Sequence, residues 1–252
     1  MPLENLHHIV ELPKKIIESP ALIGSIAATT GISYGARYER ALQIEPNELK
    51  RYYKKIIYLA AEFAGFAQTP TNRDDASLSH QARAAGKAAF FSCAFDVASD
   101  WGKSTMLHQT FQHVLEAETS PRLTDMAMDL FNRDIAGELL YDGLERGIIA
   151  THFVLDMMGI KEKVKDKMDV DELGIILQII DDVLDLPDDL AAGDQNCLTT
   201  LRRNEYLLQF LQGLDAVKVQ QLFPYAGLLA VSINIARTKA RQILHVQSTD
   251  TP

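Results

Sequence analysis

Cysteine and basic residues are scarce in this chain, and their scarcity excludes several classes of protein. The only cysteines are Cys93 and Cys197, which are too few for a disulfide framework and lack the paired spacing of a zinc site. We therefore expect a reducing, cytoplasmic setting. The 25 Lys and Arg residues face 34 Asp and Glu residues, for a formal net charge of -9. No basic stripe is present to neutralise phosphates, so we expect no nucleic-acid partner.

Long apolar runs are also missing. No stretch approaches the ~18 residues that a membrane-spanning helix needs. The first residues, MPLENLHHIVELPKK, lack a basic region followed by an uninterrupted apolar stretch. The expectation is a soluble protein without a transmembrane segment.

Alternating β-branched runs, which would indicate strands, do not occur either. Apolar residues instead recur three or four apart, which predicts helices. No internal repeat or Gly/Ser-rich linker divides the chain, so we expect one all-α domain over residues 1–252. The predicted helices cover residues 4–17, 21–42, 46–67, 77–101, 104–118, 121–144, 146–160, 169–187, 198–212 and 224–246. Segments 84–97 and 173–186 are apolar nearly all round, which predicts a central position in the bundle.

One of these central segments carries a cluster of aspartates. On a helix Asp181, Asp185 and Asp189 lie at i, i+4 and i+8 and share one stripe, with Asp182 beside them. Like charges at this spacing repel each other unless a cation lies among them. Mg²⁺ is a hard cation that takes carboxylate oxygens and bridges to phosphates, so the cluster predicts a site for magnesium and diphosphate.

The alternative interpretation is a solvated acidic helix end. In that case Pro187 would finish the helix near Leu186, and the later aspartates would cap the following turn. The apolar residues around the cluster, including Ile179, Ile180 and Val183, favour a buried helix over a surface one.

A second carboxylate pair follows the other central segment. Asp96 and Asp100 are again at i and i+4, just beyond an apolar helical stretch. Alone, this pair would indicate a solvated helix face. Together with the first cluster it favours a metal site built by facing helices of a bundle.

These residues resemble motifs of the isoprenoid synthase superfamily. Between about Leu139 and Asn196, Gln178 followed by Asp181, Asp182 and Asp185 resembles the second aspartate-rich motif of the trans-prenyl diphosphate synthases. The run DVLDLPDDLAAGDQN is also similar to large-terpene synthases of the tetraprenyl-curcumene type.

The first metal motif of the superfamily would correspond to Asp96 and Asp100. The spacing is D-x-x-x-D, which is closer to squalene, phytoene and some terpene synthases than to the D-D-x-x-D of chain-elongating enzymes. The resemblance implies a single-domain helical bundle of the class I terpenoid synthase type with a central active-site cavity. It implies Mg²⁺ as cofactor and an isoprenoid diphosphate as substrate. The implied metal ligands are Asp96, Asp100, Asp181, Asp182, Asp185 and Asp189, of which Asp96, Asp100, Asp181 and Asp185 are the catalytic set.

Two interpretations are open for the basic residues that could hold the diphosphate. Arg133 and Arg146 flank the acidic residues Glu138, Asp142 and Glu145, which is typical of a salt-bridged helix face. A guanidinium group also matches a diphosphate well, so both arginines are candidates.

Two further basic candidates stand near the C-terminus. Arg237 and Lys239 could close over the phosphates or face solvent. His152 lies in an apolar helix, so we predict a core histidine without a catalytic role.

The resemblance leaves more than one function open. Chain-elongating synthases carry a Gly-Lys-x-x-Arg stretch near the N-terminus, and none is visible here. A terpene synthase that ionises one allylic substrate is therefore favoured over a prenyltransferase, with a non-catalytic synthase-like subunit as a third possibility. A homodimer is left open.

Overall fold

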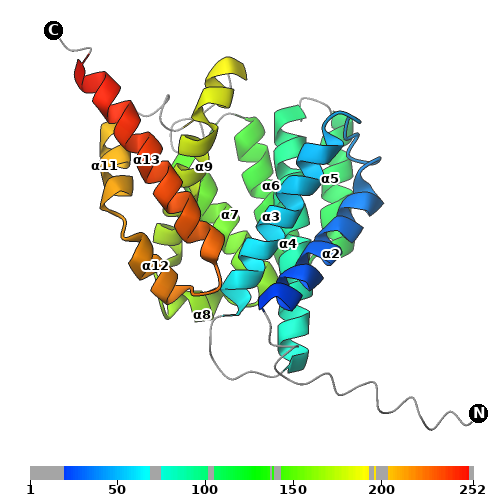
Figure 1. Cartoon of the computed structure of the whole chain (residues 1–252). Coiled ribbons are helices and arrows are strands. Elements are labelled where there is room, and N and C mark those ends of the chain that lie inside the picture. The colour runs from blue at the N-terminus through cyan, green and yellow to red at the C-terminus, as the bar shows by residue number, and fades with distance from the viewer. Residues whose placement is uncertain are drawn as a thin grey trace, which may run out of the picture.

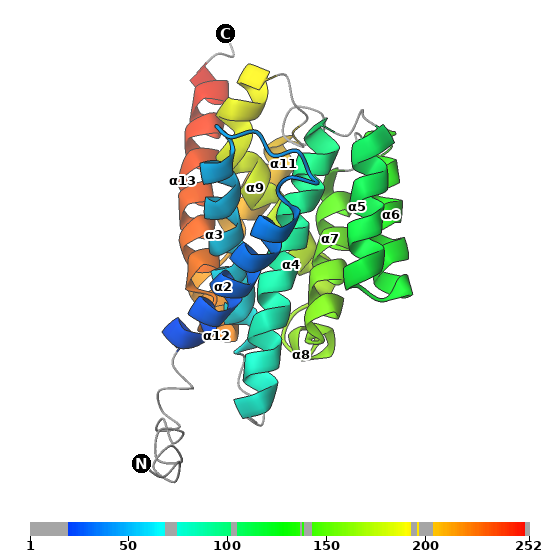
Figure 2. The ribbon, with the colours of Figure 1, turned by 90° about the vertical axis from the view of Figure 1, so that its right-hand side faces the viewer.

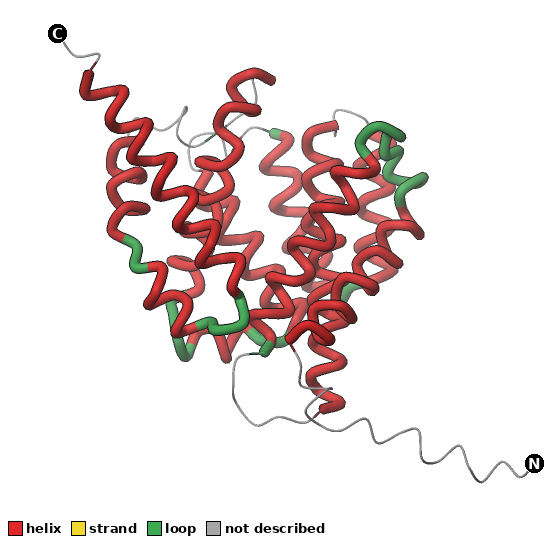
Figure 3. Tube along the Cα trace, in the orientation of Figure 1, coloured by secondary structure: helices red, strands yellow, loops and turns green. Residues whose placement is uncertain are grey.

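The computed structural model describes residues 20–68, 75–101, 105–136, 138, 143–192, 196 and 204–249. Within these ranges the protein is all-α, with eleven helices and no strand (Figure 3). The helices are α2 (Pro20–Tyr38), α3 (Leu49–Ala67), α4 (Asp75–Trp101), α5 (Thr105–Glu118), α6 (Pro121–Ile135), α7 (Gly143–Met158), α8 (Lys161–Lys165), α9 (Val170–Ala192), α11 (Asn204–Gly213), α12 (Ala216–Leu222) and α13 (Gly227–Thr249).

Consecutive long helices pack side by side in alternating directions. Helix α4 contacts α2, α3 and α7, and α7 contacts α9. Figures 1 and 2 show α4 and α9 running in the same direction, so that both terminate at one end of the bundle. We call this the carboxyl end of the bundle. None of the described helices is both long enough and apolar enough to span a membrane.

The two segments predicted to be central are buried. In α4 the residues from Ala88 to Phe91 are no more than 1% exposed, and in α9 Ile176, Ile179 and Val183 are similarly enclosed. Both segments belong to one hydrophobic cluster that reaches from α2 to α13. The all-round apolar pattern therefore predicted their position correctly.

Helices α7 and α9 approach each other closely at two glycines. A Cβ atom added to Gly147 would lie 2.5 Å from the carbonyl oxygen of Gly174, and one added to Gly174 would lie 2.6 Å from the Cα of Ile148. Only glycine leaves room for the two backbones at this distance. The crossing sets the position of the start of α7 against the middle of α9.

Some predicted helix boundaries are wrong. The predicted helix 121–144 ends at Ile135, and α7 begins only at Gly143. Helices α8 and α12 were not predicted, although Asp215 is a clear N-cap that accepts hydrogen bonds from the backbone N–H groups of Val217 and Lys218. The predicted helix 4–17 lies outside the described residues.

Helix α9 does not stop at Pro187. It continues to Ala192, so the interpretation in which Pro187 ends the helix near Leu186 is wrong. A proline inside a helix removes one backbone hydrogen bond and kinks or breaks the helix unless the surrounding structure supports it. Asn196 supports this part of α9 from outside, because its side-chain amide donates to the backbone carbonyl of Asp182 over 2.6 Å.

A polar network ties α2, α4 and α5 together around Glu118. The carboxylate accepts hydrogen bonds from the hydroxyl groups of Tyr38 at 2.7 Å and Tyr34 at 3.1 Å. It also pairs with Arg37 at 3.1 Å and Lys87 at 3.3 Å. Burial alone would raise the pKa of Glu118, but the hydrogen bonds from Tyr38, Lys87 and Tyr34 lower it overall.

This network predicts a pH-dependent contribution to stability. The pKa of Glu118 is lower in the folded protein than in the unfolded chain, so its contribution is complete above the unfolded pKa and is lost as the pH falls through the folded pKa. We expect Glu118→Gln to lower the free energy of unfolding by about 1–2 kcal/mol at pH 7, and by much less below about pH 4. Urea unfolding at both pH values measures this. An equal loss at both pH values would contradict the role of the charge.

Candidate functional site: an apolar cavity with a polar rim

A cavity of about 260 Å³ lies between α3, α4, α7 and α9, and α5, α6 and α13 complete its wall. Most of the lining is apolar, as is usual for sites that bind small organic ligands. The aromatic part of the lining consists of Phe63, Phe66, Phe91, Phe95, Phe111 and Phe153, together with Tyr58.

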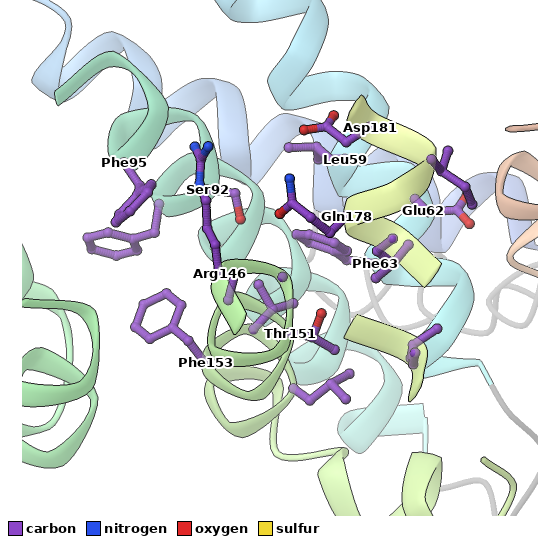
Figure 4. Close-up of a pocket in the computed structure, with 18 of the residues that line it drawn as sticks. Leu59, Glu62, Phe63, Ser92, Phe95, Arg146, Thr151, Phe153, Gln178 and Asp181 are labelled. Atoms are coloured by element: carbon purple, nitrogen blue, oxygen red, sulfur yellow. The ribbon is translucent and has the colours of Figure 1, made fainter. Parts of the chain in front are cut away.

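Polar side chains from three helices line one part of this cavity. Ser92 comes from α4, Arg146 from α7, and Gln178 and Asp181 from α9. Figure 4 shows these four residues together in the upper part of the view, with Thr151 and Phe153 below them. Arg146 is near the start of α7, and Asp181 is followed by the last turns of α9, so this polar rim faces the carboxyl end of the bundle.

Asp181 lies in the cavity wall with its side chain exposed. Asp182 is different, because it is only 7% exposed and its carboxylate accepts a hydrogen bond from Gln178 at 3.0 Å. Adjacent helix positions point about 100° apart, so the two carboxylates occupy different environments.

The other predicted metal ligands lie in the last turns of the same helices. Asp185 and Asp189 follow Asp181 by one and two turns of α9, and Asp96 and Asp100 follow Ser92 by one and two turns of α4. Their side chains lie outside the described part of the structure, and their backbones are at the carboxyl end of the bundle. Among the described side chains, no group of three or more His, Cys, Asp or Glu residues is arranged to hold a metal ion.

The two arginine candidates have different surroundings. The guanidinium group of Arg146 lines the cavity, lies 5.7 Å from the ring centre of Phe95, and has its Nε 4.0 Å from Asp134. Arg133 instead donates to Glu145 at 2.7 Å and is 3.9 Å from Glu138. The hydrogen bond from Arg133 lowers the pKa of Glu145. The predicted salt-bridged face is therefore confirmed for Arg133, although its residues belong to α6, α7 and the connection between them.

The basic residues of α13 do not line the cavity in the described structure. Arg237 is half-buried, and its Nε is buried without a hydrogen-bond partner. Lys239 is also half-buried. The proposal that these two side chains bind diphosphate is not supported by their described positions.

Two charged residues of the cavity were missed by the sequence reasoning. Lys55 and Glu62 both line it from α3, at i and i+7. Leu59 and Phe66 lie on the same stripe and also line the cavity. A signal was present, because a charged residue on the apolar stripe of an amphipathic helix is unusual.

His152 is not a core histidine. It is 27% exposed, and its Nε2 lies 2.6 Å from a carboxylate oxygen of Asp171. This partner comes from α9, 19 residues further along the chain, so spacing within one helix does not reveal it. The pair joins α7 to α9 on the outside of the cavity.

The fold and the site define an all-α protein with an apolar ligand cavity and a polar rim. No protein-family model matches the chain, and no curated protein or solved structure is significantly similar to it. The function must therefore be inferred from the residues and their geometry.

Proposed function

We propose that this protein is a magnesium-dependent class I terpene synthase, built on the bundle type of the class I terpenoid synthases, that ionises an allylic isoprenoid diphosphate. The proposal rests on one observation: the apolar cavity is lined by aromatic rings and has Asp181 and Arg146 in its polar rim. A prenyl chain is apolar and its diphosphate is strongly anionic. The apolar wall of the cavity would therefore enclose the chain, and the polar rim would face the diphosphate.

The donors at the carboxyl end of the bundle suit magnesium. Asp181 presents an exposed carboxylate, and aspartates recur in the following turns of α9 and in the last turns of α4. Carboxylate oxygens are the ligands that Mg²⁺ prefers. The residues that would hold it are Asp181, Asp185 and Asp189 on one helix and Asp96 and Asp100 on the other. Bound there, the ion would supply positive charge to the departing diphosphate.

The protein's own residues account for the remaining requirements. Arg146 would donate hydrogen bonds to the diphosphate. The apolar wall excludes water from the cation that remains after the carbon–oxygen bond breaks. Phe95 and Phe153 line the same cavity, and aromatic faces stabilise a nearby cation by ~0.5–2 kcal/mol.

A second candidate function is condensation of two isoprenoid diphosphates. Lys55 favours it, because this residue places a second basic side chain in the cavity wall and could hold another diphosphate. The sequence pattern had indicated that such a cation was missing. A terpene synthase is still preferred, since one lysine is a small positive charge for a second dianionic group.

The prediction for activity is release of diphosphate from a single substrate in the presence of magnesium. The cavity is slightly smaller than the ~300 Å³ at the lower end of ordinary ligand sites, which favours geranyl and farnesyl diphosphate over longer chains. Products should be identified with and without isopentenyl diphosphate. A hydrocarbon or alcohol from one substrate supports the terpene synthase, and a chain that lengthens only with isopentenyl diphosphate supports the alternative. No diphosphate release in either assay contradicts both.

A further inference from the structure

The side of the bundle formed by α3 and α13 differs in charge from the chain as a whole. Every exposed charged residue of α3 is basic, namely Lys50, Arg51 and Lys54. Helix α13 contains no acidic residue and exposes Arg241. The whole chain has a formal net charge of -9, so these two helices present a basic surface on an acidic protein.

The same two helices also expose large apolar side chains. Ile57 and Tyr58 on α3 are each 43% exposed, and Val231 and Ile235 on α13 are 53% and 47% exposed. They make up half of the large apolar side chains that are exposed in the described part of the chain. Single apolar residues on a surface need no explanation, but a group of them indicates an interaction site.

These apolar residues lie next to one another because α3 and α13 are in contact. The hydroxyl groups of Tyr58 and Ser232 are within hydrogen-bond distance, at 2.7 Å. Val231 directly precedes Ser232, and Ile235 follows it by about one turn of α13. Figures 1 and 2 show α3 and α13 together on one side of the bundle, away from α6 and α8. We call the surface made by the exposed residues of these two helices the α3–α13 face.

The α3–α13 face lies over the candidate site. Tyr58 and Ser232 line the cavity, although Tyr58 is also exposed to solvent. The start of α13 is held against α3 at the same place, because the backbone N–H of Leu229 donates to Oε1 of Glu62 over 2.8 Å. An apolar molecule at this face is therefore separated from the cavity by the contact between Tyr58 and Ser232.

The combination of basic and apolar side chains matches the surface of an anionic lipid bilayer. Basic side chains attract the anionic headgroups, and exposed apolar side chains enter the boundary between headgroups and acyl chains. Acidic residues on the far side of the bundle weaken this attraction little. They are more than one helix diameter of about 10 Å away, and salt screens charges beyond about 8 Å. Glu45 and Glu48 precede α3 and offset part of the charge near Lys50, so Arg51 and Lys54 are the better residues to test.

We propose that the α3–α13 face docks on an anionic lipid bilayer and so brings the cavity wall at Tyr58 and Ser232 to the lipid. This docking needs neither magnesium nor diphosphate, so it goes beyond the proposed reaction. One consequence does rest on the proposed function: a prenyl chain dissolved in the bilayer would reach the cavity without crossing water.

Binding of the full chain to lipid vesicles in a sedimentation assay tests the proposal. Vesicles of phosphatidylcholine with about one third phosphatidylserine should bind the protein at least about tenfold more tightly than vesicles of phosphatidylcholine alone. Raising the salt concentration should weaken the binding, because the headgroup attraction is screened. EDTA is present throughout, since Mg²⁺ would join aspartates to lipid phosphates.

A pair of double variants tests the basic residues. Arg51→Gln combined with Lys54→Gln should weaken binding to the anionic vesicles by about tenfold or more. Arg122→Gln combined with Lys165→Gln is the matched control, because it removes one arginine and one lysine charge from exposed positions on α6 and α8. These helices lie away from the α3–α13 face, so the control should bind as the wild type does (Figure 2).

A pair of single variants tests the apolar residues. Ile57→Ser should weaken binding to the anionic vesicles by about fivefold, because a half-exposed isoleucine no longer enters the lipid. Ile135→Ser is the control, since Ile135 is 42% exposed on α6 and Ile57 is 43% exposed. The control should have no effect. Circular dichroism shows that the variants are folded.

Three results would overturn the proposal. The first is a wild-type protein that does not prefer anionic vesicles, which is decisive even if a variant fails to fold. The second is an equal loss of binding in the α3 variants and their controls. The third is a wild-type dimer that Ile57→Ser dissociates and that binds no vesicles, because the face would then join two copies of this chain.

The outcome is independent of the proposed reaction. A protein that docks on anionic vesicles through Arg51 and Lys54 but releases no diphosphate would contradict the terpene synthase proposal and support this one. Diphosphate release by a protein that binds no vesicles would do the reverse.

Discussion

Asp181→Ala should lower the rate of magnesium-dependent diphosphate release by about a hundredfold to a thousandfold. Asp181 is the one predicted metal ligand whose described side chain lies in the cavity wall with exposure to solvent. Its carboxylate would help to hold the positive charge that neutralises the departing diphosphate, and the apolar walls make that interaction strong. The release of diphosphate from farnesyl diphosphate, followed over a series of magnesium concentrations, measures the effect.

The same substitution should leave the fold intact. The side chain is exposed, and its removal relieves repulsion with the aspartates one turn away, so the free energy of unfolding without magnesium should be unchanged or slightly higher. Glu172→Ala is the matched control, because it removes an exposed carboxylate from the opposite end of α9. If Asp181→Ala released diphosphate at the wild-type rate, Asp181 would not be a metal ligand.

Gly147→Ala should destabilise the protein by about 3 kcal/mol and reduce activity further than its loss of stability explains. The added Cβ atom would lie 2.5 Å from the carbonyl oxygen of Gly174 and 2.6 Å from the Cβ atom of Gln178. The first contact is with backbone, which cannot rotate away, so α7 and α9 must separate. Arg146 on α7 and Asp181 on α9 both belong to the polar rim, so the rim would widen as the two helices separate.

Gly24→Ala is the control for this second prediction. Gly24 is also inside a helix, but no heavy atom lies within 4 Å of an added Cβ atom. Alanine favours a helix over glycine, so Gly24→Ala should stabilise the protein by about 0.5–1 kcal/mol. Denaturant unfolding of both variants gives the comparison. A neutral or stabilising Gly147→Ala would show that the crossing tolerates a methyl group.

The positions of the long helices were predictable because each has an apolar face with helical spacing. The predictions for residues 77–101 and 104–118 lie within two residues of α4 and α5. The predicted helices are wrong where a local sequence signal competes with tertiary packing. Pro187 is a strong local helix breaker, yet α9 passes through it while the hydrogen bond from Asn196 supports the preceding turn. Helix α12 was missed because it has only seven residues.

The candidate site was predictable only in part, because contacts between helices decide which side chains share the cavity. Asp181, from the predicted aspartate motif, lines the cavity, and its role as a metal ligand stays a prediction. The motif did not distinguish Asp181 from Asp182, which face the cavity and the packed side of α9 respectively. Lys55 and Glu62 were overlooked, because a charged residue within an apolar stripe has no local consequence until neighbouring helices enclose it.

The sequence by itself determined the helical class, the burial of the central segments of α4 and α9, and the presence of aspartates in repeated turns. These follow from periodicity and composition, which act over a few residues. Only the tertiary structure decided which charged groups share a cavity. That depends on the crossing of α7 and α9 at Gly147 and on the docking of α13 against Glu62, and both contacts join residues far apart in the chain. Their surroundings, and hence their chemistry, exist only after the helices have packed.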